Sequence, residues 1–78
     1  MTLEEFDQLN YEGRLDATQK AVCIAGREEN KFKVLLFQLN DFYIEVYYNA
    51  KLNFISQLIP FRSTDNLEPY LQKISLHY

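Results

Sequence analysis

The 78-residue sequence predicts an α+β fold, a four-stranded antiparallel β-meander with one helix before it and one after it. Three observations support this prediction: helix-capping residues near both ends, β-rich runs in the middle, and short polar breaks between those runs. The length suits a single small globular domain, so residues 1–78 are treated as one unit. The expected order is α-β-β-β-β-α, with both helices packed on the same face of the sheet.

The first helix is expected over residues 3–12. Thr2 and Glu5 have the spacing of a capping box, in which each side chain accepts a hydrogen bond from the other residue's backbone N–H. Apolar residues then recur at helical spacing, and Gly13 is suited to end the helix because glycine readily adopts the left-handed conformation.

The segment over residues 15–25 lacks helical spacing and ends in a compact apolar run at 21–25. A run of this kind indicates a strand. The polar residues 26–30 that follow it predict a loop, so the strand is expected to end before Gly26.

The strongest local pattern is a central hairpin. Two β-rich runs, residues 31–39 and 42–48, flank Asn40 and Asp41, both of which tolerate the backbone conformations of a tight turn. This turn places three apolar pairs on one face of the sheet, because cross-strand partners point the same way. The pairs are Leu39 with Phe42, Phe37 with Ile44, and Leu35 with Val46. We therefore expect this face to form the core beneath the helices.

Residues 52–61 form the fourth expected strand, which is entered through a turn at 49–51. Pro60 lacks a backbone N–H, so we expect this part of the strand at an edge or a bulge. A final helix is expected to begin near Asn66, with Pro69 in its first turn. Its apolar stripe consists of Leu67, Tyr70, Leu71 and Ile74.

Charge and composition narrow the class of protein. The formal net charge is −3, with acidic ends and a mildly basic middle, whereas nucleic-acid binders concentrate positive charge more strongly. The acidic start differs from a signal peptide, and no apolar run reaches the roughly 18 residues that span a bilayer. With one cysteine and no membrane signal, the chain is expected in the reducing cytoplasm.

The opposite face of the central hairpin is unusual for a sheet surface that meets water. It mixes two aliphatic residues and two tyrosines with two polar groups, whereas a solvated sheet face is mostly polar. Its members are Val34, Leu36, Gln38, Tyr43, Glu45 and Tyr47.

Several accounts of this second face stay open. It is either ordinary surface, because tyrosine tolerates exposure, or the core of a protein interface, including that of a homodimer. In a third account Tyr43 and Tyr47 stack on the bases of a single-stranded nucleic acid, although Glu45 lies between them and Lys33 falls on the other face. A small-ligand surface is the remaining alternative, and an edge strand offers a further route to pairing with another chain.

The sequence offers little catalytic or metal-binding chemistry. Cys23 and His77 are the one thiol–imidazole combination, but the cysteine lies in an apolar run and the histidine is the penultimate residue. No spacing of histidines, cysteines and carboxylates fits a metal, and no glycine-rich phosphate loop occurs. We expect no catalytic site, no metal and no cofactor.

Arg62, Ser63 and Thr64 precede the last expected helix and form a candidate anion site. Backbone N–H groups at a helix start attract anions, and an arginine with two hydroxyls suits a phosphate or a carboxylate. The simpler alternative is that Arg62 pairs with a nearby acid while the two hydroxyls organise the loop.

These patterns predict a small non-catalytic protein-interaction module that self-associates or acts as an adaptor through the second face. The motivation is that a domain of this size leaves a half-apolar face uncovered. The alternative is a module that binds a small ligand or nucleic acid, through Tyr43 and Tyr47 or through the anion site at Arg62.

Overall fold

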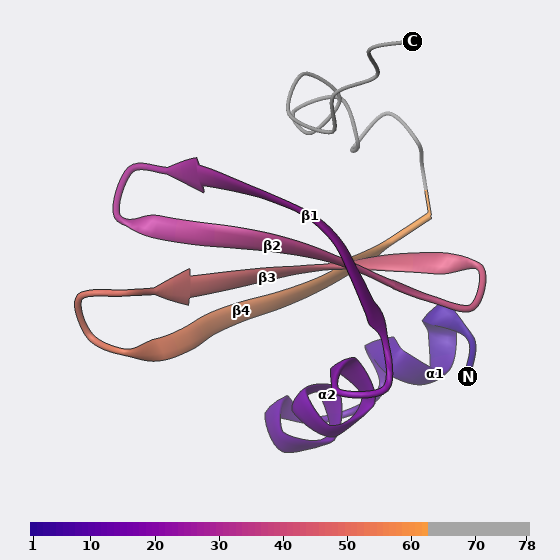
Figure 1. The fold of residues 1–78 in the computed structure, drawn as a ribbon. Helices are drawn as coiled ribbons and strands as arrows, with labels where there is room; N and C mark the ends of the chain where they lie inside the picture. The colour runs from indigo at the N-terminus through magenta and orange to yellow at the C-terminus, as the bar shows by residue number, and fades with distance from the viewer. Residues whose placement is uncertain (63–78) are drawn as a thin grey trace, which may run out of the picture.

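The structure is a computed structural model that describes residues 1–62. Within them, two helices precede four strands, in the order α1 (Leu3–Asp7), α2 (Tyr11–Thr18), β1 (Val22–Glu29), β2 (Phe32–Leu39), β3 (Phe42–Asn49) and β4 (Phe54–Phe61). The strands form an antiparallel meander in which neighbours in sequence pair, so β1 and β4 are its edges (Figure 1). The predicted α+β class and the meander are confirmed, whereas the helix expected from Asn66 lies outside the described residues.

The N-terminal region differs from the prediction, because the single helix over 3–12 is replaced by two helices. The predicted capping box is confirmed: the Thr2 N–H donates to Glu5 Oε1 at 2.8 Å and the Glu5 N–H donates to Thr2 Oγ1 at 3.2 Å. A second cap, Asn10, begins α2, where its Oδ1 accepts from the Gly13 N–H at 2.8 Å. Gly13 therefore lies in the first turn of α2 and ends no helix.

The first strand also differs from its predicted position. The strand expected over 15–25 is helical through residue 18, and β1 continues through most of the loop expected at 26–30. Pairing explains this extension, because Gly26 lies opposite Leu35 and the strand stays in register with β2 up to the turn. That turn contains Asn30 at a φ of 56°, a left-handed conformation that asparagine adopts at low cost.

The central hairpin has the predicted register. The structure pairs Leu39 with Phe42, Phe37 with Ile44, and Leu35 with Val46. Asn40 occupies the turn at a φ of 56°. The fourth strand begins at Phe54, two residues later than predicted, and Pro60 lies on an edge strand as expected.

The core lies between the helices and the face that holds these three pairs, the first face. Its buried residues are Phe6, Ala17, Phe42, Ile44, Val46 and Leu58. The ring centroids of Phe6 and Phe42 are 5.7 Å apart, which joins α1 to β3. Full burial of side chains of this size contributes about 1.5–3 kcal/mol each. The N-terminal helices therefore cover the first face, as predicted for the first helix.

Arg14 of α2 joins both helices to the sheet. Its Nη1 donates to the Leu58 carbonyl at 2.9 Å, and its Nη2 donates to the Asp7 carbonyl at 2.8 Å. The guanidinium also lies 5.4 Å from the centroid of the Phe6 ring. This one side chain donates to backbone carbonyls at the end of α1, where a helix leaves its last carbonyls without a donor, and in the edge strand β4.

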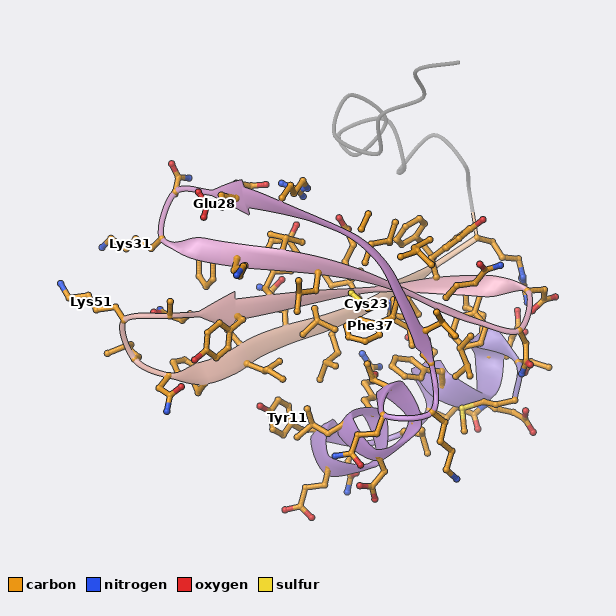
Figure 2. All side chains as sticks on the ribbon, viewed as in Figure 1. Tyr11, Cys23, Glu28, Lys31, Phe37 and Lys51 are labelled. Atoms are coloured by element: carbon orange, nitrogen blue, oxygen red, sulfur yellow. The ribbon has the colours of Figure 1, made fainter. Side chains whose placement is uncertain are left out.

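Figure 2 shows how the sheet and helices are separated by side chains. Phe37 points from the sheet towards α2, whereas Lys31 and Lys51 extend from hairpin turns away from the body of the protein. The Tyr11 hydroxyl donates to the Ile55 carbonyl at 2.7 Å and holds the start of α2 beside β4. Within residues 1–62, no helix is long and apolar enough to cross a membrane.

Candidate functional site

The second face of the sheet, opposite α1 and α2, holds the six residues of the predicted interface. They form three cross-strand pairs between β2 and β3: Val34 with Tyr47, Leu36 with Glu45, and Gln38 with Tyr43. The sequence pattern therefore placed these residues together correctly. Their exposure and their contacts within the chain decide which of them a partner could reach.

The middle of this face is enclosed. Val34 and Leu36 have 0% of their surface exposed, and Glu45 is also buried. The two tyrosines are half-buried, and Gln38 is exposed. Only part of the predicted face therefore meets solvent, and that part is its rim.

An ion pair lies within this enclosed region. Arg27 Nη2 is 3.2 Å from Glu45 Oε2, with side-chain exposures of 13% and 11%. The same nitrogen lies 3.3 Å from the Tyr47 hydroxyl, and Arg27 also pairs with Glu29 at the edge of the sheet. Arg27 was not predicted as a residue of this face, because it falls among the polar residues 26–30 that indicated a loop.

Both tyrosine rings have aromatic partners in the chain itself. Tyr43 stacks on Phe61 with ring centroids 5.4 Å apart, and Tyr47 meets Phe32 edge to face at 5.9 Å. A stacking platform for nucleic-acid bases needs open ring faces and a basic rim. Here Glu45 lies between the tyrosines and is paired with Arg27.

An accessible apolar part of the second face lies on β4. Phe54 and Ile59 are 45% and 38% exposed, and they lie opposite Asn49 and Glu45 of β3, on the same side as the tyrosines. The strand contains no charged residue between Phe54 and Phe61. We call this strip the β4 margin; its exposed members are Phe54, Gln57 and Ile59, and it ends at Phe61, which is buried.

The β4 margin was not predictable from alternation in the sequence, because strand β4 is irregular. The pairing shifts between Tyr47 and Tyr48, which lie opposite Gln57 and Ile55, so that one residue of β4 has no partner. Across such a bulge, side chains no longer alternate regularly between the two faces of the sheet. Phe54 and Ile59, five positions apart, consequently share a face.

Of the three residues of the candidate anion site, Arg62 alone lies within the described residues. Arg62 Nη2 donates to Glu4 Oε1 at 2.9 Å, which agrees with the simpler alternative in which the arginine pairs with an acid. This hydrogen bond lowers the pKa of the Glu4 carboxyl from its ordinary value. Ser63 and Thr64 lie outside the described residues.

Cys23 is not the core residue that its apolar neighbours indicated. It lies exposed on the edge strand β1, opposite Phe37, and is labelled in Figure 2. His77 lies outside the described residues. In the part of the chain that the structure describes, no group of three histidines, cysteines and carboxylates could hold a metal ion.

A groove of about 310 Å³ opens between α2 and the first face. Two of its polar side chains are engaged within the chain: the Thr18 hydroxyl donates to the Arg14 carbonyl at 2.7 Å, and the Tyr48 hydroxyl bonds to Asn53. Among residues 1–62, the lining therefore offers chiefly apolar contact and contains no carboxylate, imidazole or thiol. The lining residues are Leu15, Thr18, Gln19, Leu35, Phe37, Val46, Tyr48, Ile55 and Leu58.

Comparison with known proteins gave no relative from which a role could be transferred, since no family, no curated protein and no solved structure matches the chain.

Proposed function

We propose that this protein is a non-catalytic protein-interaction module that self-associates through the second face, with the β4 margin as the contact surface. The observation that carries the proposal is the exposure of Phe54 and Ile59 on an uncharged edge strand. Exposed apolar side chains at a sheet edge favour contact with another chain, because contact removes their apolar surface from water.

A second copy is the partner that suits this surface. A strand without charge gives two copies no electrostatic repulsion at the contact, and it offers a charged foreign partner no complementary group. A chain of 78 residues also has a small core, and association adds buried surface to it. Leu52, exposed in the turn that leads into β4, extends the apolar surface at one end.

The alternative of a nucleic-acid or anion-binding module has less support. The rings of Tyr43 and Tyr47 contact Phe61 and Phe32, and the guanidinium of Arg62 pairs with Glu4. These contacts occupy the groups that would bind a base or a phosphate.

The test compares two substitutions on the same face but at opposite edges. Ile59→Glu places a charge in the β4 margin, whereas Val22→Glu places the same charge on β1, where the side chain is 64% exposed. We expect Ile59→Glu to weaken the dimer at least tenfold in sedimentation velocity, about 1.4 kcal/mol, and Val22→Glu to leave it unchanged. Equal effects of the two substitutions would contradict the β4 margin as the contact surface.

A further inference from the structure

We propose that the outer edge of β1 binds an extended peptide segment of another protein, which pairs antiparallel with residues 25–29. Within residues 1–62, β1 pairs with β2 on one side only, so the backbone groups of its other side are available to an added strand. Figure 1 shows that the second half of β1 lies at the outer edge of the sheet, away from α1 and α2.

The opposite edge strand, β4, is less suited to strand addition. Pro60 has no N–H, and a sheet tolerates proline where that missing donor faces away from the neighbouring strand. The backbone of Leu58, two positions earlier, faces the same way, and its carbonyl accepts from Arg14 Nη1 at 2.9 Å. The Ile55 carbonyl accepts from the Tyr11 hydroxyl. Since β4 lacks a donor and α2 engages its acceptors, β1 is the better edge for an added strand.

Residues 25–29 of β1 pair regularly with β2. The irregularity of β1 lies between Cys23 and Ala25, so Ile24 has no partner, whereas every residue from Ala25 to Glu29 has one. A bulge protects an edge by twisting it away from an incoming strand. This bulge precedes the regular segment and therefore leaves residues 25–29 as a template.

Gly26 indicates which side chain the added strand carries. Gly26 lies opposite Leu35, which lines the apolar groove of the first face. A Cβ atom placed on Gly26 would lie 3.3 Å from Cδ2 of Leu35, so the leucine side chain leans over the glycine. An aromatic side chain on a neighbouring strand is suited to cover an edge glycine. An aromatic residue opposite Gly26 therefore packs on Leu35 and extends the apolar surface of the groove.

Glu28 indicates a second feature of the partner. It lies two positions after Gly26 and hence on the same face, and it is exposed near the outer end of β1 (Figure 2). Lys33 of β2 lies opposite Glu28, so a basic residue on the added strand continues the alternation of charge across the sheet. In an antiparallel strand this basic residue precedes the aromatic residue by two positions.

Strand addition at β1 goes beyond self-association and does not depend on it, because β1 and β4 are opposite edges of the sheet. Contact between the β4 margins of two copies leaves both β1 edges accessible. The dimer then presents two edges that bind extended segments, as an adaptor requires.

The test uses the full chain and the capped hexapeptide Thr-Lys-Val-Phe-Val-Thr, which has the expected basic and aromatic spacing. Backbone amide NMR signals of the chain report binding. We expect the signals of residues 22–29 to shift and amide hydrogen exchange in β1 to slow, because an added strand bonds to the outer N–H groups.

Two N-methylated peptides are the backbone controls, one methylated on both valines and the other on lysine and phenylalanine. Only one of these sets of N–H groups faces β1 in an added strand, because successive residues of a strand point their N–H groups to opposite sides. One peptide should therefore bind roughly tenfold more weakly than the other.

Variants of the chain test the two side-chain contacts. Glu28→Lys should weaken binding about fivefold, because it replaces an attraction with a repulsion. Glu12→Lys makes the same charge change at an exposed position of α2 and should leave binding unchanged. Gly26→Ala should weaken binding of the phenylalanine peptide but not of a version with alanine in its place, because the added methyl group occupies the site of the ring.

Four results would overturn the proposal. They are the absence of shifts at about 1 mM peptide, shifts confined to residues 54–61, equal binding of the two N-methylated peptides, and equal effects of the two charge reversals. Binding of the peptide to the Ile59→Glu chain supports strand addition even where the dimer is lost. The two proposals therefore fail separately.

Discussion

The guanidinium of Arg27 lies 3.2 Å from the carboxylate of Glu45, and both side chains are largely enclosed within the apolar second face. An enclosed ion pair contributes little net stability compared with well-packed apolar side chains, but removal of one partner leaves the other charge in a poorly hydrated place. The pair therefore makes the second face sensitive to single substitutions.

Arg27→Met is expected to lower the free energy of unfolding by about 3 kcal/mol, because it removes the cation beside a buried carboxylate. The double variant Arg27→Met/Glu45→Leu should recover most of this loss. Urea unfolding measures both. Lys31→Met, at an exposed hairpin turn, is the matched control and should have little effect. If the double variant loses as much unfolding free energy as Arg27→Met and Glu45→Leu lose together, the two side chains do not interact and the ion pair is not the cause of the loss.

Arg14→Lys is expected to destabilise the fold by about 2 kcal/mol, because an ammonium cannot reproduce the two-pronged contact with the Leu58 and Asp7 carbonyls. Thermal or urea unfolding provides the measurement. Arg62→Lys is the control, since its exposed contact with Glu4 tolerates the change of geometry. Equal losses in the two variants would show that Arg14 does not join the helices to the sheet.

The Glu4–Arg62 contact predicts a pH dependence. Because the folded chain holds the pKa of Glu4 below its ordinary value of 4.5, the contact stabilises the fold above that pH. The contribution is lost as the pH falls through the lowered pKa. The difference in unfolding free energy between the unsubstituted chain and Glu4→Gln should therefore be present at neutral pH and shrink in acid. Arg62→Gln should give the same profile, and a difference independent of pH would contradict the assignment.

Asn30→Gly should leave stability unchanged or raise it slightly, whereas Asn30→Ala should lower it by about 1 kcal/mol. The reason is the φ of 56° at this turn, which glycine adopts freely and alanine adopts only at a cost. The melting temperatures of the two variants provide the comparison. Lys31→Ala, at the neighbouring position, is the control. Equal stability of the alanine and glycine variants would rule out this backbone requirement.

The parts of the fold that were predictable from the sequence depend on local signals. In the central hairpin, Asn40 and Asp41 set the turn, and regular alternation on both sides set the register of the core pairs. The capping box at Thr2 likewise depends on two residues only three positions apart, Thr2 and Glu5. In each case the residues that determine the structure lie within a few positions of one another.

The missed features depend on contacts distant in sequence or on irregular backbone. Arg27 belongs to a strand because β2 pairs with it, although its polar neighbours indicated a loop. Phe54 and Ile59 share a face only because a bulge intervenes between them. Asn10 is a residue type that commonly caps helices, but the helix predicted from the capping box at Thr2 ran through it to residue 12, so the start of a second helix was not predicted.

The measurement that tests the central claim most directly is the absolute mass of the unsubstituted chain, determined by light scattering on a sizing column through a dilution series. Self-association through the β4 margin predicts a mass near twice 9.3 kDa at high concentration, which falls towards 9.3 kDa on dilution. A mass of 9.3 kDa at every concentration would contradict it.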